Sequence, residues 1–268
     1  MAPKFSDEEQ QPENQLKQAL NETTPLVADF ARVAQIIAEH NNQASALCLY
    51  HGFENLANQY DLPPGFSGQY DERDFDLFKF LGHELFVTMI GHLLRDESWE
   101  IISALLKSPL YVENGFSVDG KNQSFDYLGE YVKTLYYASK RAQRISLHAD
   151  WLKERHETSP LSEVMPWTLF LEADFFLFLR KQIESEEPEG IQWRAWSSLY
   201  LGQLPRFVAR METSDFASRV VPALGVPNVE SFKQRLGESG RKLNPKAIFG
   251  DGWPRPFPDI SPQNIATR

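Results

Sequence analysis

The sequence predicts a mainly α-helical protein, an irregular multi-helix globule around one buried central helix, with little or no sheet. Three observations support this fold class. Apolar residues recur at helical spacing over most of the chain. The run at 166–183 is apolar nearly all round, as expected for a helix that is packed on every side. Alternation of apolar and polar residues is nowhere long enough to indicate a sheet.

The N-terminal half is expected to hold several helices behind a polar leader. Residues 1–24 are rich in Gln, Glu and Asn, and are interpreted as a flexible leader or a marginal first helix. A single helical domain is predicted over 25–242, with helical periodicity up to about residue 60 and again over 75–94. The segment 108–124 has the residues of a loop and is the candidate boundary between two halves of this domain.

The second half is predicted to contain one long helix or two over 125–156, followed by the central helix, with Pro166 in its first turn. Residues 191–202 fit either a strand or a short helix, and two short helices are expected between 214 and 239. Residues 243–268 hold several prolines and are predicted to form an extended tail that docks on a neighbouring subunit or on the chain's own body.

Composition limits the classes of function. Hydrophobic residues make up 42% of the 268 positions, enough for a packed core. The net charge of −10 argues against nucleic-acid binding through overall positive charge and leaves only local basic patches for it. The N-terminus lacks an apolar signal-peptide core, and the most apolar run is interrupted by Glu172 and Asp174. A cytoplasmic protein that binds no membrane is therefore expected.

One stretch concentrates positive charge. If 140–155 is a continuous helix, six of its side chains fall within one broad stripe, because each residue turns the helix by about 100°. Ile145, Ala149 and Leu152 would form the adjacent apolar face. In an acidic chain such a stripe is a candidate site for phosphate, nucleotide or an acidic partner. The alternative is a solvated face, or one neutralised by nearby acids. This basic stripe comprises Lys140, Arg141, Arg144, His148, Trp151 and Arg155.

Two of these residues match a catalytic spacing. Arg141 and His148 fit the loose R-x(4–6)-H pattern of helical HEPN ribonucleases, in which the pair acts on the RNA 2′-hydroxyl and the scissile phosphate. Chance alone gives about one such match in a chain of this composition. The pattern therefore supports an alternative hypothesis, a ribonuclease or nucleotide-processing enzyme.

The central helix carries two acids. Glu172 and Asp174 lie on opposite sides of it, and burying a carboxylate without a partner costs on the order of several kcal/mol. We therefore expect at least one of them to meet a cation or to reach the surface, and we predict an arginine of the basic stripe as one partner. A structural ion pair is favoured over an acid–base role.

Other candidate motifs are weaker. His83, Glu84 and His92 are candidate metal ligands. The two histidines, however, are nine residues apart and lie on opposite faces of one helix, so no metal site is predicted, and no cofactor is predicted either. Residues 115–122 have the spacing of a phosphate-binding loop, but Asn122 replaces the Ser or Thr that would bind magnesium. A turn between helices explains these glycines equally well.

Cysteine and tryptophan give two further expectations. Cys48 is predicted to be a small buried hydrophobe. Trp193 and Trp196, with Arg194 between them, fit a stacking platform, although core packing is the commoner use of such rings.

Several segments in order resemble a known kind of module. They are SWEIISALLKSPLYV, HADWLKERH, LEADFFLFLR, PRFVAR, DFASRVVPALGV and the terminal IATR. Together, over 98–268, they look like the helical modules that accompany effector domains in bacterial antiphage defence proteins. The resemblance implies a role in sensing or assembly, with the toxic chemistry carried elsewhere. No effector domain is evident before residue 75, so the effector would be a separate subunit. No functional residue is carried over.

The leading hypothesis is a non-enzymatic helical binding or assembly protein, a subunit or sensor in a bacterial defence system. Its partner would be another protein, such as an effector subunit, held by the basic stripe and by the tail. Nucleic acid would bind only through the stripe. Besides the enzyme with Arg141 and His148, a small-molecule-binding protein with an aromatic pocket beside the central helix is a third hypothesis.

Overall fold

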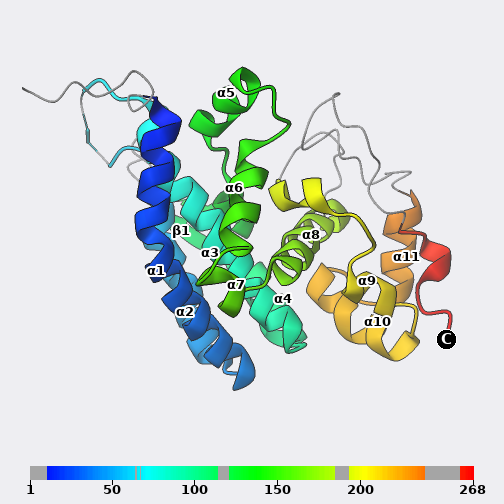
Figure 1. Cartoon of the computed structure of the whole chain (residues 1–268). Coiled ribbons are helices and arrows are strands. Elements are labelled where there is room, and N and C mark those ends of the chain that lie inside the picture. The colour runs from blue at the N-terminus through cyan, green and yellow to red at the C-terminus, as the bar shows by residue number, and fades with distance from the viewer. Residues whose placement is uncertain (1–10, 64, 67, 114–120, 185–192, 239–259) are drawn as a thin grey trace, which may run out of the picture.

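The predicted mainly α-helical fold is confirmed. The computed structural model describes residues 11–63, 65–66, 68–113, 121–184, 193–238 and 260–268. Over these residues eleven α-helices surround the core, and the sheet is one antiparallel pair of three-residue strands, β1 (Leu110–Val112) and β2 (Lys121–Gln123). The helices form an irregular assembly in which α1 runs along one side and α9 to α11 lie at the other (Figure 1).

The N-terminal part is built from α1 (Pro12–Glu39), α2 (Gln43–Ala57), α3 (Asp76–Arg95) and α4 (Trp99–Lys107), with a 3-10 turn η1 (Glu72–Phe75) before α3. Of the two expectations for residues 1–24, a flexible leader or a first helix, residues 12–24 adopt the helix, because α1 begins at Pro12 and continues through Pro25. Its first turns are held by Leu16 and Leu20, which are buried in the core among otherwise polar neighbours. Residues 1–10 of that leader lie outside the described residues.

The segment at 125–156, which was predicted as one helix or two, is interrupted twice. It folds as the 3-10 turn η2 (Phe125–Gly129), then α5 (Lys133–Arg141) and α6 (Leu147–His156), and the short α7 (Leu161–Val164) follows. Between α5 and α6, Gln143 has a positive φ of 52° and Ser146 caps α6 by accepting a hydrogen bond from the backbone N–H of Ala149 at 3.1 Å. Helix α5 therefore stands at the edge of the molecule (Figure 1).

The C-terminal part wraps the far side of α8 (Trp167–Glu184). It consists of the 3-10 turn η3 (Trp196–Tyr200), α9 (Arg206–Arg210), α10 (Ser214–Val220), the 3-10 turn η4 (Val221–Leu224), α11 (Val229–Glu238) and the final turn η5 (Pro262–Asn264). Of the segment at 191–202, residues 196–200 form the 3-10 turn η3, and the other described residues lie outside helices and strands.

The end of the chain docks on its own body. The backbone N–H groups of Ala266 and Thr267 donate to the carbonyls of Met211 and Glu212, each at 2.8 Å. Ile260 and Ile265 are buried. Of the two docking modes expected for the tail, the described end adopts the one on its own chain. The part of the tail at 243–259 lies outside the described residues.

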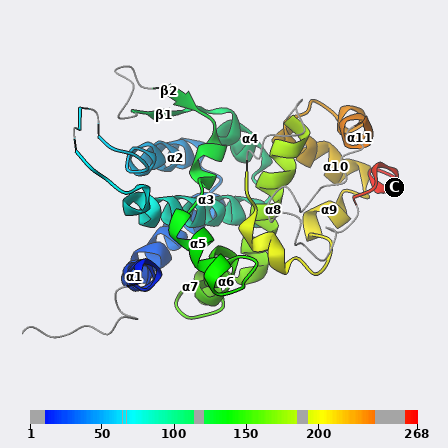
Figure 2. The same ribbon diagram turned by 90° about the horizontal axis from the view of Figure 1, so that it is seen from above.

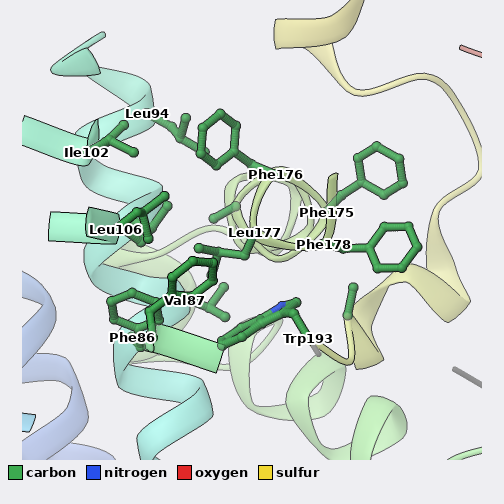
Figure 3. Close-up of a cluster of buried hydrophobic side chains, with 14 of the residues drawn as sticks. Phe86, Val87, Leu94, Ile102, Leu106, Phe175, Phe176, Leu177, Phe178 and Trp193 are labelled. Carbon is green, nitrogen blue, oxygen red and sulfur yellow. The ribbon is translucent and has the colours of Figure 1, made fainter. Parts of the chain in front are cut away.

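Helices α3 and α8 meet at the centre of the fold (Figure 2). The predicted central helix is α8, and its aromatic side chains point to both sides, with Phe176 toward Leu94 and with Phe175 and Phe178 away from α3 (Figure 3). Helix α3 is as deeply buried. Together with η1 it forms the helical segment Glu72–Arg95, which is long and apolar enough to cross a membrane. However, 78% of its most apolar stretch is buried inside the fold, as in the core helix of a soluble protein.

Candidate functional site

The basic stripe is not a continuous surface. His148, Trp151 and Arg155 point into the protein from α6 and are only 3%, 8% and 8% exposed. Lys140, Arg141 and Arg144 instead lie exposed at the end of α5 and in the turn that follows. The prediction was wrong because the break at 142–146 rotates the two halves of the segment relative to each other. The expected apolar face is divided in the same way, since Ala149 and Leu152 are buried whereas Ile145 is 48% exposed.

Arg155 is a structural cation. Its guanidinium forms a two-pronged pair with Glu84, with Nε–Oε1 at 2.7 Å and Nη2–Oε2 at 3.0 Å, and donates to the carbonyl of Leu20 at 2.7 Å. Burial raises the pKa of Glu84, but Arg155 and His156 outweigh it and bring this pKa down to about 2. The pair joins α6, α3 and α1, so it stabilises the fold from within.

The two acids of α8 have other partners than predicted. Asp174 is fully buried and accepts hydrogen bonds from Trp193 Nε1 at 2.8 Å and from the backbone N and Oγ of Ser197 at 2.9 and 2.7 Å, and His83 Nε2 lies 3.1 Å away. Glu172, which is half-buried, accepts from the backbone N of Arg206 at 3.2 Å. The expected pairing with an arginine of the basic stripe is therefore wrong, because Arg155 points toward Glu84 of α3.

His148 is a core residue. Its ring lies between Phe80 and Trp196, at centroid distances of 4.7 and 5.2 Å and nearly parallel to both. Neither ring nitrogen has a hydrogen-bond partner among the residues that the structure describes. Burial, with a smaller effect of His83, lowers its pKa well below the usual value, so the ring is neutral. Arg141, by contrast, is exposed and pairs with Glu13 at 2.7 Å. The two residues do not form the solvent-facing pair that the ribonuclease pattern requires.

The structure also shows the positions of Cys48, of candidate metal ligands and of part of the phosphate-loop match. Cys48 is exposed on the outer face of α2, so its predicted burial was wrong. Within the described part of the chain, no three His, Cys, Asp or Glu side chains lie close enough together to hold a metal ion. The phosphate-loop match lies outside the described residues except for Lys121 and Asn122, which belong to β2.

The pocket hypothesis finds little support around α8, where the aromatic rings are buried in contact with other side chains. A hollow of about 1080 Å³ lies elsewhere, between the C-terminal end of α1, helix α4 and helix α10. Its rim carries acids of both α1 and the α3–α4 turn, such as Glu39 and Asp96.

A chain of rings and cations runs from the core to the surface beside α5. The Arg194 guanidinium lies 5.1 Å from the ring centroid of Tyr131 and 5.9 Å from that of Trp196. Tyr131 contacts Tyr136 edge-on at 5.2 Å, and Lys140 Nζ lies 4.0 Å from the Tyr136 ring centroid. Tyr137 contacts Tyr136 at 5.4 Å. We call this set the aromatic–cation ladder; it comprises Trp196, Arg194, Tyr131, Tyr136, Tyr137 and Lys140.

The fold holds both ends of the ladder. At its inner end Trp196 stacks on His148, which stacks in turn on Phe80 of α3. At its outer end, α5 is fixed by the buried carboxylate of Asp76, which accepts hydrogen bonds from the backbone N of Lys133 at 3.0 Å and of Thr134 at 2.6 Å. This carboxylate satisfies free N–H groups of the first turn of α5 and complements its helix dipole. The exposed tyrosines are thereby presented on a positioned helix.

We call the exposed region around α5 the α5 corner. The cations of this corner differ in their partners. Lys133, Arg141 and Arg144 form ion pairs with Glu72, Glu13 and Asp150, at 2.7, 2.7 and 2.8 Å. In the described residues, neither Arg194 nor Lys140 has a carboxylate within ion-pair distance; their contacts are with aromatic rings. Burial lowers the pKa of Arg194, with Glu130 and Tyr131 acting in the opposite direction. Arginine remains charged at neutral pH even so.

Part of the ladder was visible in the sequence. The pattern Trp193–Arg194–Trp196 suggested a stacking platform or core packing, and both tryptophans are buried in the core. Trp193 donates to Asp174, and Trp196 stacks on His148 while the Arg194 guanidinium lies 5.9 Å from its ring centroid. The tyrosines of α5 were not predicted as site residues, because the prediction for that segment rested on its charged side chains alone.

Comparison with other proteins adds no assignment. The chain matches no protein-family model, no curated protein and no solved structure.

Proposed function

We propose that this chain is a binding and assembly protein that holds a protein partner on the aromatic–cation ladder. The observation that carries the proposal is the position of Arg194 and Lys140, two cations with no carboxylate partner in the described part of the chain. They lie among tyrosines, of which Tyr136 and Tyr137 are 39% and 46% exposed. Tyrosine, tryptophan and arginine dominate the energetic centres of protein interfaces. Tyrosine in particular offers a large contact area with little loss of side-chain entropy.

The charges favour an acidic patch on the partner. Two cations that have no carboxylate partner among the described residues gain one from an acidic surface, and apolar Ile145, 48% exposed, extends the contact. A nucleic acid is less suitable, because most other cations of the corner are already paired with Glu72, Glu13 and Asp150. A phosphate backbone would meet those acids as well, in a chain with a net charge of −10.

The resemblance to helical modules of bacterial antiphage defence proteins suggests the biological setting. In that setting the chain is a cytoplasmic sensor or assembly subunit of a bacterial defence system, and its partner is an effector subunit. The partner would then carry the chemistry. The ribonuclease alternative is less favoured, because His148 is enclosed between two rings while Arg141 lies on the surface.

Variant-dependent co-purification tests the proposal. Tagged wild-type protein is purified from the native host beside the double variant Tyr136→Ala/Tyr137→Ala and a matched control, Tyr70→Ala/Tyr111→Ala, whose tyrosines are 41% and 47% exposed elsewhere. We expect wild type and control to retain the same protein in stoichiometric amount and the ladder variant to lose it. The purified components are then recombined to measure affinity.

Two results would contradict the proposal. One is retention of every bound protein by the ladder variant. The other is stoichiometric RNA, lost only by the ladder variant, with no protein bound. The RNA result would mean that this surface binds nucleic acid, because bases can stack on the same rings.

A further inference from the structure

A small hollow lies at the foot of the ladder. Its volume is about 310 Å³, and Tyr131 and Arg194 line it as well as belonging to the ladder. Other lining residues include Ser124, Glu130 and Lys181. The volume is at the lower end of the range of about 300–1,000 Å³ that is usual for ligand pockets. It therefore suits one side chain or a small ligand.

Arg194 brings unused hydrogen-bond donors to this hollow. Its guanidinium is held by the rings of Tyr131 and Trp196, and its N–H groups donate no hydrogen bond to the described residues. Five N–H donors in a planar fork match the two oxygens of a carboxylate. Because the group is partly buried, it has already lost some of its water, and a bidentate acceptor would restore those hydrogen bonds.

The neighbouring charges select the kind of anion. Lys181 Nζ lies 2.8 Å from Asp126 Oδ1 and donates to Ser124 Oγ at 2.9 Å, so this cation is already neutralised. Glu130 lies 3.8 Å from Lys79 Nζ. Once these pairs are counted, Arg194 supplies the remaining positive charge. One free charge beside two carboxylates fits a monoanion better than a doubly charged phosphate.

We propose that this hollow receives the carboxylate of an Asp or Glu side chain of the partner, bound through both oxygens by Arg194, while residues around that acid cover Tyr136 and Tyr137. This inference rests on the proposed function and deepens it by naming the anchoring group. It predicts that the partner's contact surface centres on one acidic side chain.

A titration of the intact wild-type chain tests the site without the partner. The probes are N-acetyl-glutamate N-methylamide and its glutamine analogue, which differ in one charged group. The readout is the arginine Nε–Hε region of the NMR spectrum, in which the Arg194 signal is identified by its loss in Arg194→Lys. We expect a saturable shift of this signal with the glutamate probe and none with the glutamine probe at matched ionic strength. Equal shifts with both probes, or none with either, would overturn the inference.

Affinity for the co-purified partner separates this inference from the proposed function. Arg194→Gln is expected to weaken binding by about tenfold or more, since a hydrogen-bonded charge pair is lost, and Arg194→Lys to weaken it less. The control is Arg210→Gln, which removes another guanidinium that lies over a ring, 4.0 Å from the centroid of Phe216. Thermal unfolding of each variant checks that the fold is intact.

The combined outcomes are distinguishable. If Tyr136→Ala/Tyr137→Ala releases the partner and Arg194→Gln binds it as tightly as wild type, the carboxylate anchor is wrong and the proposed function stands. If neither variant changes the affinity, both are wrong. If Arg194→Gln does not fold, the titration of the wild-type chain decides the question.

Discussion

The polar groups at the centre of the molecule and those at the α5 corner are arranged in opposite ways. At the centre, Asp174 and Glu84 are fully buried, and each is surrounded by donors from neighbouring elements. At the corner, Arg194 and Lys140 lie against aromatic rings and no carboxylate of the described residues pairs with them. The buried carboxylates of the centre are satisfied within the chain, whereas the corner leaves donors for another molecule.

This difference shows why charge alone is a poor guide to function here. A buried charge is costly unless it is paired, so a fully paired one in the core mainly preserves the fold. A cation held by rings and left without a carboxylate can gain from a partner. Removing groups at the centre should therefore reduce stability, and removing groups at the corner should reduce binding.

The largest effect is expected at Asp174. We predict that Asp174→Ala lowers the free energy of unfolding by about 3–5 kcal/mol, because the Trp193 N–H and the Ser197 N–H and hydroxyl lose their acceptor in the core. Urea denaturation measures this change. Glu172→Ala on the same helix is the control and should cost about 1 kcal/mol, because that side chain is half-buried and has a backbone donor at 3.2 Å. Equal losses from both variants would contradict the assignment.

Arg155 and Arg144 provide a comparison within the former basic stripe. Arg155→Gln should also lower stability by about 3–5 kcal/mol, since it leaves Glu84 buried without its partner. Arg144→Gln should change stability by less than about 1 kcal/mol, because Arg144 is 56% exposed in its pair with Asp150. Differential scanning calorimetry of the two variants checks the prediction. A small loss for Arg155→Gln would mean that its pair is as dispensable as a surface one.

Arg144 and Arg155 also show which parts of the structure could be predicted from the sequence. Helical periodicity was enough to predict the fold class and the buried central helix, because an apolar run without a polar face leaves few other arrangements. It failed at 142–146, where one residue with positive φ and a cap by Ser146 divide the helix. Extending a 100° step across that break placed Arg144 and Arg155 on one face, although one is exposed and the other buried.

The ladder was beyond prediction for another reason. Tyr131 and Arg194 are far apart in the sequence, and their contact depends on how α5 and η3 pack around α6. The sequence indicated a ring–cation–ring pattern at 193–196 but not which tyrosines would extend it. In the same way, the buried pair of Glu84 and Arg155 depends on tertiary packing, which no local spacing reveals.

Acidification should destabilise the centre through its histidines. Burial lowers the pKa of His92 to about 4 and that of His148 well below its usual value, and neither ring has a hydrogen-bond partner within the described part of the chain. The unfolded chain therefore binds protons first as the pH falls below about 6.5, so stability is present above that pH and is lost toward pH 4. The loss through His92 alone is on the order of 3 kcal/mol.

Urea denaturation between pH 7.5 and 4.5 measures this dependence. His92→Leu, which places an apolar side chain at the site, should flatten the pH profile. A profile for His92→Leu that falls as steeply as that of wild type would show that the imidazole of His92 does not titrate as described.

The smallest effect on stability is expected at the corner. Tyr136→Ala/Tyr137→Ala should change the free energy of unfolding by less than about 1 kcal/mol, since both rings are more than one-third exposed. Thermal unfolding beside wild type checks this. A loss as large as that of Asp174→Ala would mean that the tyrosines belong to the core's support rather than to a binding surface.

The most direct test of the central claim is the affinity of this stable double variant for the co-purified protein partner, measured by isothermal titration calorimetry. We predict that Tyr136→Ala/Tyr137→Ala loses measurable binding, while Tyr70→Ala/Tyr111→Ala binds like wild type. An unchanged affinity in the ladder variant would contradict the account, because the exposed rings and their cations would then have no part in holding a partner.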